Sequence, residues 1–413
     1  MAGAISIGTT GLAAASKELD VIGNNLANSN TLGFKSGGIY FSSMLNQSLT
    51  SGASNTQVGQ GVSVLAIQNQ FTQGSFDTTS SGTDLAIDGE GFFIVTDTDG
   101  TRYYTRAGAF VLDKDGYMVD TKGYRVQGHI ITNGVESTTL SDLQLGSLQS
   151  APVATTTISI AANLNANAAI GDTYQTSQTV YDSLGNDHEL TVTYTKSATT
   201  GQWIPTATLT KTGAAGTVTA TLTLTPTGAA SPLTFDSTGA LTSPAQYTFN
   251  TSGFTYPGGA TFADVTWNLS GADHLDVTQY ASTSVTKQLY VDGYPSGSLK
   301  NISIDKSGIV SGYFTNGQTQ DIARVMLASF PSNVGLAKIG NYFVQSFSSG
   351  QAVYNNPDSA GLGSIKSSTL ETSNVDTATE FMNMISAQRM YQANAKVITT
   401  ADAMLSTLMS IKQ

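Results

Sequence analysis

The residues best suited to acid–base or metal chemistry are three histidines, and the sequence does not group them. His129, His188 and His274 lie far apart along the chain, and none belongs to a His-x-x-x-His pair of the kind that binds zinc. The run Asp187-His188-Glu189 follows a turn and opens a strand at Leu190. Side chains that follow one another on a strand point to opposite faces, so we expect no acid–base cluster there.

Other catalytic signatures are missing from the sequence. It contains no cysteine, which excludes disulfides, thiolate nucleophiles and Cys-ligated metals. Neither a Gly-x-Ser-x-Gly elbow nor a phosphate-binding Gly-x-x-x-x-Gly-Lys loop is present. A calcium loop that began at Asp97 would close at Gly108, which has no carboxylate. We predict that the protein is not an enzyme and takes no metal and no cofactor. A carbohydrate-active β-protein stays open as an alternative, because paired carboxylates have no fixed spacing.

The charge pattern excludes two classes of partner. Charged residues make up only 11% of the chain and the formal net charge is -11, with basic residues sparse and scattered. Such a pattern predicts no nucleic-acid surface and no basic membrane patch. No apolar run approaches the roughly 20 residues that span a bilayer, so we expect no membrane insertion. The N-terminal residues lack the basic and apolar regions of a cleaved secretory signal.

Apolar and small residues near the N-terminus recur at steps of three and four. This spacing predicts a helix over residues 1–30 with a heptad seam along one side. The helix should end near Asn28, because Asn30 and Gly33 are turn-forming residues. The seam contains Ile5, Gly8, Leu12, Ala15, Leu19, Ile22 and Leu26.

A second helix is predicted over residues 375–413. Asp376 or Thr377 could cap it, and neither Gly nor Pro follows up to Ile411. Its apolar residues form two neighbouring rows, which make a broad stripe. The large apolar residues predicted to pack are Phe381, Met384, Ile385, Tyr391, Val397, Ile398, Leu405 and Leu408. The two terminal helices could simply pack on each other inside one domain. The apolar stripe is wider than a two-helix hairpin can bury, however, so we expect it to pack also against other subunits.

The middle of the chain changes to an alternating pattern typical of β-strands. Leu190, Val192 and Tyr194 alternate with threonines, which predicts a half-buried strand with a wet face. A four-residue Asp-x-x-Gly turn recurs, and Asp followed by Gly in this spacing is typical of hairpins. The six turns begin at Asp97, Asp113, Asp120, Asp182, Asp236 and Asp305.

A drop in basic residues marks an inserted domain. Lys196 and Lys211 are the only lysine or arginine residues between Val126 and Thr286. We predict a multidomain α+β protein in which paired N- and C-terminal coiled-coil helices carry two nested, mostly antiparallel β domains. The predicted parts are helices at 1–30 and 375–413, a linker at 31–70, an inner β domain at 71–148 and 285–370, and an inserted outer β domain at 149–284.

Both ends of the sequence also resemble a known family. The stretch from Leu19 to Lys35, LDVIGNNLANSNTLGFK, resembles the N-terminal signature of flagellar rod, hook and hook-associated proteins. The stretches Leu370–Asp376 and Met384–Lys396 resemble their C-terminal signature. The residues that carry the motif are Asn24, Asn25, Asn28, Asn30, Gly33, Phe34, Asn374, Val375, Asp376, Gln388, Arg389 and Asn394.

The middle of the chain narrows the resemblance to hook proteins. Residues 84–93 and 104–110 resemble the β domain that rod and hook proteins share, and residues 181–190 resemble the outer domain of hook proteins. Distal rod proteins are much shorter and would lack an inserted domain of this size. The likeness is weaker between about 195 and 280, where it depends on position and strand pattern.

The resemblance implies a structural subunit of the flagellar hook, a flexible tube that acts as a universal joint between rod and filament. It implies a homo-oligomer with the terminal helices innermost, in contact with the distal rod protein, the hook cap protein and the hook-filament junction proteins. It also implies export through the flagellar type III apparatus, without a cleaved signal peptide, to the hook and basal body outside the cell surface.

Two other functions remain as alternatives. A distal rod or hook-filament junction protein would share both terminal signatures. A glycan-binding adhesin would instead need exposed aromatic side chains in the outer domain, which Trp203 and Trp267 could supply, although single tryptophans in strands are more often buried.

Overall fold

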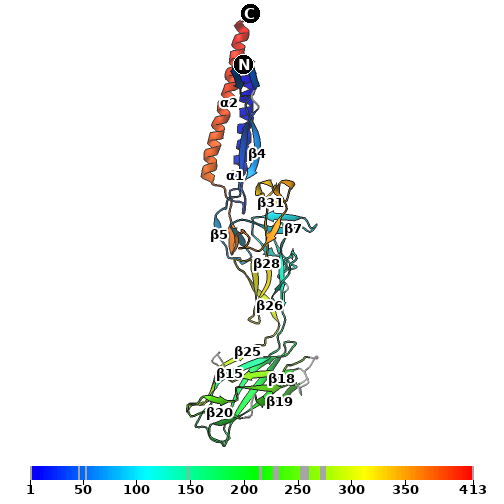
Figure 1. Cartoon of the computed structure of the whole chain (residues 1–413), viewed down its shortest axis with the longest axis vertical. Coiled ribbons are helices and arrows are strands. Elements are labelled where there is room, and N and C mark those ends of the chain that lie inside the picture. The colour runs from blue at the N-terminus through cyan, green and yellow to red at the C-terminus, as the bar shows by residue number, and fades with distance from the viewer. Residues whose placement is uncertain are drawn as a thin grey trace. The chain divides into compact units, whose positions relative to one another are not determined.

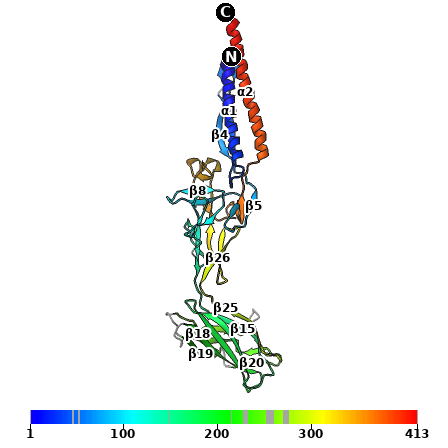
Figure 2. The same cartoon turned by 180° about the vertical axis from the view of Figure 1, so that it is seen from behind.

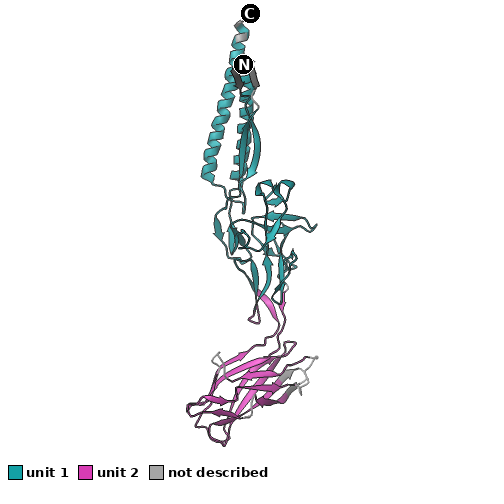
Figure 3. Cartoon of the chain, viewed as in Figure 1, with its two compact units in different colours: residues 1–147, 301–313, 319–413 teal, residues 148–300, 314–318 magenta. Residues whose placement is uncertain are grey.

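A computed structural model of the chain describes residues 2–44, 47–51, 54–146, 148–213, 216–226, 232–251, 260–269 and 276–411. The chain divides into two compact units, shown in Figure 3. Unit 1 contains residues 1–147, 301–313 and 319–413, and unit 2 contains residues 148–300 and 314–318. Unit 2 is thus inserted into unit 1. The predicted boundaries within unit 1, between helices, linker and inner β domain, stay a prediction.

Two helices begin and end the described chain. Helix α1 spans Ala2–Ala27 and helix α2 spans Thr377–Ile411. Figures 1 and 2 show the two helices side by side, and they are in contact. Asp376 caps α2, because its Oδ1 accepts hydrogen bonds from the backbone N–H of Ala378 at 2.9 Å and of Thr379 at 3.3 Å. These bonds lower the pKa of the Asp376 carboxyl.

A two-stranded ribbon lies along α1 on residues that were predicted as a linker. Its antiparallel strands are β1 (Gly37–Ser43) and β4 (Val62–Asn69), and β2 (Gln47–Ser51) pairs with β3 (Ser54–Val58) between them. Glycines allow the ribbon to approach the helix closely. A Cβ placed on Gly61, where φ is +103°, would overlap the hydroxyl oxygen of Thr10.

The main sheet of unit 1 surrounds an aromatic core. The core contains Phe92, Tyr104, Phe330 and Phe343, whose rings meet mostly edge to face or tilted. Part of this sheet has the strand order β27-β28-β11-β7-β8-β31-β30. The bounds of these strands are β27 (Ile309–Phe314), β28 (Thr319–Val325), β11 (Arg125–Thr132), β7 (Phe92–Thr96), β8 (Arg102–Thr105), β31 (Tyr342–Val344) and β30 (Ala337–Ile339).

Shorter strands complete unit 1. Two antiparallel pairs bring the segment that precedes α2 back beside residues near 80. These pairs are β5 (Phe76–Thr78) with β34 (Thr369–Glu371), and β6 (Leu85–Asp88) with β33 (Ser364–Ser367). The remaining short strands are β9 (Val111–Leu112), β10 (Met118–Val119), β12 (Val135–Glu136), β13 (Ser141–Asp142), β29 (Leu327–Ser329) and β32 (Val353–Asn355).

Unit 2 is a mostly antiparallel β-sheet around its own core. The strand order is β16-β17-β18-β19-β22-β23-β15-β24, with β25 paired to β15, β20 paired to β18 and β21 paired to β20. Only the pairings of β15 with β23 and β24 are parallel among the described strands. The bounds are β15 (Thr157–Asn163), β16 (Thr173–Tyr181), β17 (Asp187–Lys196), β18 (Gln202–Gly213), β19 (Gly216–Pro226), β20 (Leu233–Phe235), β21 (Leu241–Ser243), β22 (Gln246–Asn250), β23 (Val265–Asn268), β24 (Val277–Thr278) and β25 (Val285–Val291). Two further strands, β14 (Gln149–Ser150) and β26 (Gly297–Ile304), pair with each other and belong to the same sheet as β27.

The alternation in the sequence predicts the faces of these strands correctly. Leu190, Val192 and Tyr194 of β17 are buried, and the threonines between them are more exposed. All six Asp-x-x-Gly turns also form as predicted. In each, the Gly N–H donates to the Asp carbonyl and the Gly φ lies between +77° and +87°.

Candidate functional site: the helix pair and its junction

Small residues let α1 and α2 approach closely. A Cβ added to Gly8 would lie 2.9 Å from Cγ1 of Ile398, and one added to Gly11 would lie 2.7 Å from Nδ2 of Asn394. Ala15 of α1 and Ala387 of α2 are completely buried. The contact between the helices is therefore a narrow seam of small side chains, which leaves most large apolar residues beside it.

The structure separates the predicted packing residues into two groups. On α1, Ile22 is buried and Ile5, Leu12, Leu19 and Leu26 are half-buried. On α2, Met384, Ile398 and Leu405 are half-buried, whereas Phe381, Ile385, Tyr391 and Val397 are exposed. The side chain of Leu408 lies outside the described residues. The structure therefore brings the α1 residues near the seam and leaves half of the α2 residues facing solvent.

Helix α2 exposes an unusual amount of apolar surface. Met390, Val397 and Met404 are seven residues apart and so share one face of the helix. The exposed large apolar residues of α2, with their exposed fractions, are Phe381 (51%), Met382 (65%), Ile385 (51%), Met390 (42%), Tyr391 (39%), Val397 (44%), Met404 (58%) and Met409 (74%). Exposed large apolar side chains in this number are typical of a protein–protein contact surface.

The side chain of Asn25 connects α1 to Gly37 and Glu380 through hydrogen bonds. Its side chain is 2% exposed, and its Nδ2 donates to the carbonyl oxygen of Gly37 and to Oε1 of Glu380, both at 2.9 Å. Its Oδ1 accepts from the N–H of Gly37 at 2.8 Å. Glu380 thereby joins α2 to α1 through Asn25.

A buried ion cluster lies where the chain leaves α1 and enters α2. Nζ of Lys35 donates to Oε1 of Glu371 at 2.6 Å, and Nη1 of Arg106 lies 3.4 Å from Oε2 of the same carboxylate. The side chains of Lys35 and Glu371 are completely buried. Burial lowers the pKa of Lys35, and the Glu371 charge opposes that shift. Because a buried charge must be paired, this carboxylate holds three distant segments together.

Further motif residues close the same junction. Oδ1 of Asn374 accepts from the N–H of Ser36 at 2.8 Å, and its Nδ2 donates to the carbonyl of Gln70 at 2.9 Å. Gly33 adopts φ +65°, and a Cβ there would lie 2.5 Å from the Ala107 nitrogen, so only glycine fits. The N–H of Gly33 donates to the Glu371 carbonyl at 2.8 Å.

The other motif residues are less confined. Asn28 and Val375 are half-buried, and Phe34 is buried under the amine of Lys338, which lies 3.9 Å from the ring centroid. Asn24, Asn30, Gln388 and Arg389 are exposed, and Asn394 is half-buried against Gly11.

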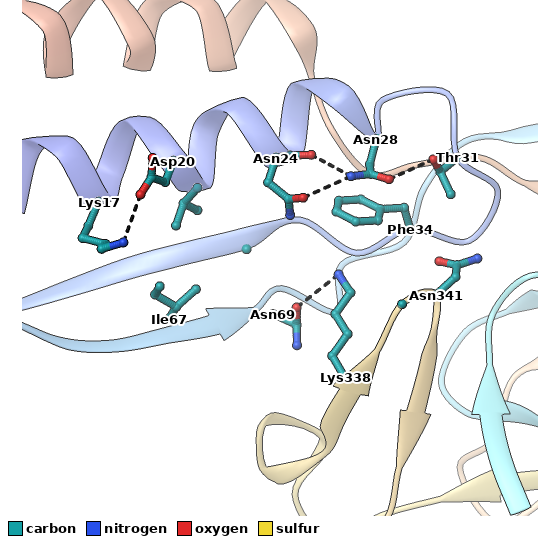
Figure 4. A pocket seen from close by; sticks show the side chains of 13 residues that line it. Lys17, Asp20, Asn24, Asn28, Thr31, Phe34, Ile67, Asn69, Lys338 and Asn341 are labelled. Carbon is teal, nitrogen blue, oxygen red and sulfur yellow. Dashed lines mark hydrogen bonds and ion pairs between the residues drawn. The ribbon is translucent and has the colours of Figure 1, made fainter.

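A pocket of about 720 Å³ opens beside the junction, between α1, the ribbon and the turn after β30. Figure 4 shows the side chains that line it, with Phe34 between Asn28 and Asn341 and with Lys338 extending from β30 toward Asn69. Nζ of Lys338 donates to the carbonyl of Lys35 at 3.2 Å and to Oδ1 of Asn69 at 3.5 Å.

The residues considered for catalysis lie apart from this region. In unit 2, His188 is buried and Nε2 lies 3.1 Å from Oδ2 of Asp182, while Asp187 and Glu189 are exposed on the opposite face of β17. In unit 1, Nδ1 of His129 lies 3.0 Å from Oε1 of Glu136. His274 lies outside the described residues. Among the residues that the structure describes, no three His, Asp or Glu side chains gather as metal ligands.

The two tryptophans bear on the adhesin alternative. Trp203 is 1% exposed and Trp267 is completely buried. Both belong to the core of unit 2, where Tyr247 and Phe249 stack on Trp267. Neither tryptophan can offer the exposed ring that stacking on a sugar requires.

Comparison with known proteins places these features in a family. The flagellar hook protein FlgE of Borreliella burgdorferi is 34% identical over 98% of this chain and 98% of its own length. FlgE of Escherichia coli is 33% identical over 99% of this chain and 100% of its own. The chain belongs to the flagellar hook protein FlgE family. It is a structural subunit of the hook type and not an enzyme.

Four family models match successive parts of the chain. They are the flagellar basal body rod protein at residues 5–35, the hook protein FlgE/F/G D1 domain at 86–166, the basal body protein FlaE D2 domain at 147–294 and the rod FlgEFG protein C-terminal at 366–411. The crystal structure of Helicobacter pylori FlgE2 aligns with 72% of this chain and 100% of its own, at 17% identity and a TM-score of 0.47.

Sequence reasoning missed the ion cluster of this hook-family chain. Lys35 and Glu371 lie inside the two terminal motifs but 336 positions apart, and Arg106 lies in a third segment. The available signal was their opposite charge in a chain with few charges.

Within the described residues, neither helix has an apolar stretch long enough to cross a membrane.

Proposed function

We propose that the chain self-assembles into the hook tube through α1 and α2, which form a coiled-coil inner layer with the helices of neighbouring copies. The observation that carries this proposal is the exposed apolar face of α2. A large apolar side chain buried from half exposure contributes roughly 1 kcal/mol, so the eight exposed ones of α2 together favour association strongly. The narrow seam with α1 leaves that face available.

The ribbon adds a second apolar surface to the same layer. Tyr40, Phe41, Val64, Leu65 and Ile67 are between 37% and 69% exposed. A two-stranded ribbon that shows large apolar side chains to solvent is rarely stable by itself. A neighbouring copy that covers it would stabilise both the ribbon and the tube.

The tube serves as a universal joint between rod and filament. Its partners besides further copies are the distal rod protein, the hook cap protein and the hook-filament junction proteins, and its subunits leave through the type III export apparatus to the hook outside the cell surface. Exposed threonines such as Thr221 and Thr223 on β19 support bending, because weak polar contacts can exchange at small cost as subunits shift.

Removing α2 tests the proposal. A chain that ends at Asp376 should keep the core of unit 2 and its buried tryptophan emission, because none of that core lies in α2. The same chain should form no tubes by electron microscopy at concentrations where the full chain polymerises. Tubes of normal width from the shortened chain would contradict helix-driven assembly. The full chain, purified in parallel, is the control.

A further inference from the structure

The pocket beside the junction is lined by two lysines, Lys17 and Lys338, and by one acidic side chain among the described residues. Of the described residues that line it, Asp20 alone carries a carboxylate. That carboxylate already forms an ion pair with Lys17, in which Nζ of Lys17 lies 3.1 Å from Oδ2 of Asp20. Lys338 and four asparagines supply most of the other polar groups. A site with this imbalance favours a ligand that offers oxygen acceptors.

Lys338 is the strongest of these donors. It is half-buried, and burial lowers the pKa of its amine. Its contacts are the ring of Phe34 and the oxygens of Lys35 and Asn69, all of them uncharged. No carboxylate in the described ranges forms an ion pair with it. A partly buried cation without an anion is costly, and an incoming carboxylate would remove that cost.

The side-chain amides of Asn24 and Asn69 also offer hydrogen-bond donors in this pocket. Oδ1 of Asn24 accepts from Nδ2 of Asn28 at 3.3 Å, and Oδ1 of Asn69 accepts from Lys338 at 3.5 Å. Because the oxygen of each amide already accepts a hydrogen bond, Nδ2 of Asn24 and Nδ2 of Asn69 are the groups that remain available, and both are donors. Neither nitrogen donates to an acceptor in the described part of the chain. In Figure 4 the Asn24 nitrogen points toward the ribbon, above Asn69 and Lys338.

We propose that this pocket receives a carboxylate side chain from a second copy of the chain, paired with Lys338 and held by the amides of Asn24 and Asn69. The inference rests on the proposed self-assembly. The second copy is favoured by charge, because 29 acidic against 18 basic residues leave every copy with carboxylates that lack a cation. The pocket also lies beside α1 and the ribbon, so it is continuous with the surfaces proposed to assemble.

Substitution of Lys338 tests the charge. Lys338→Gln in the full chain should raise the critical concentration for tube formation about ten-fold, the loss expected for a charge-assisted hydrogen bond. Lys114→Gln is the matched control, because Lys114 is exposed in the turn that begins at Asp113 and its loss changes net charge equally. Equal critical concentrations for Lys338→Gln and Lys114→Gln would overturn the proposal.

A second variant avoids the contacts that Lys338 makes within its own copy. Asn24→Asp keeps the oxygen that accepts from Asn28 but replaces the donor with a second oxygen. It should repel an incoming carboxylate and raise the critical concentration, while the melting curve of the unassembled protein changes little because Asn24 is exposed. Unchanged assembly of Asn24→Asp would count against the pocket as a carboxylate site.

Cross-linking identifies the occupant directly. A photoreactive amino acid in place of Lys17, whose side chain is 62% exposed at the rim, should join an acidic peptide of another copy in assembled tubes. Isotope-mixed tubes distinguish links between copies from links within one. Links only within one copy, or only to a different protein, would refute the assignment. If the unmodified chain forms no tubes, the proposed function itself fails, whereas normal tubes with an empty pocket defeat this inference alone.

Discussion

At the scale of single residues, Glu371 has the most demanding position in unit 1. Its carboxylate forms ion pairs with Lys35 and Arg106 and accepts a hydrogen bond from the N–H of Gly74 at 3.0 Å. Its backbone carbonyl accepts from Gly33, so one residue fixes the exit of α1 and the approach to α2. Such a cluster stabilises only while it is complete, because each charge is buried.

We therefore expect Glu371→Gln to destabilise unit 1 by about 3–5 kcal/mol, since the neutral amide leaves two buried cations without an anion. Chemical denaturation followed by far-UV circular dichroism would measure the loss. Asp88→Asn is the control, because Asp88 pairs with Lys366 at 2.7 Å but is 45% exposed, and such pairs contribute less than about 1 kcal/mol. Equal effects of the two variants would show that Glu371 is not the hub described.

At the scale of elements, a substitution on the exposed side of α2 should weaken assembly without changing the fold. We expect Ile385→Gln to leave the helix intact, because glutamine has a helix propensity at least equal to that of isoleucine and Ile385 is 51% exposed. The same change should raise the critical concentration for tubes several-fold, since it removes apolar area from the proposed contact face. Sedimentation of tubes at graded concentrations measures this.

Ile170→Gln is the matched control for that prediction. Ile170 is 73% exposed in unit 2, so the chemistry of the change is the same but the position is remote from the helices in sequence and unit. Tube formation that responds equally to both substitutions would mean that general surface hydrophobicity drives association, and not the face of α2.

The elements that the sequence predicted well are those specified by local patterns. Heptad spacing predicted helices that the structure places at Ala2–Ala27 and Thr377–Ile411, and the Asp-x-x-Gly spacing predicted six turns. Alternating threonines predicted the two faces of β17. In each case residues a few positions apart carry the whole signal.

Distant pairs explain what the sequence could not predict. Lys35 meets Glu371 across 336 positions, and Asn25 meets Glu380 across 355. No local period encodes such contacts. The ribbon of β1 and β4 also has no clear alternation, because its glycines and serines depend on α1 for the surface they pack against. Tertiary contact, rather than intrinsic propensity, makes these residues strands.

At the scale of the whole molecule, two units with separate cores share one chain. The core of unit 2 contains Trp203, Trp267, Tyr194 and Phe249, all at most 1% exposed. The ends of its main segment meet, because the N–H of Leu299 donates to the carbonyl of Leu148 at 3.4 Å. An insertion whose ends are adjacent and whose core is its own can fold independently.

Residues 148–300 produced alone should therefore unfold cooperatively, with a midpoint within about 5 °C of the tryptophan transition in the full chain, the shift that one to two kcal/mol causes in a domain of this size. Both tryptophans of the chain lie in unit 2, so their emission reports that unit even when unit 1 is present. Glu371→Gln supplies the control in the full chain, because it should lower the unfolding transition of unit 1 and leave the tryptophan transition in place. If the isolated segment shows no transition, or if Glu371→Gln shifts both transitions together, the two cores depend on each other and the insertion is not an independent folding unit.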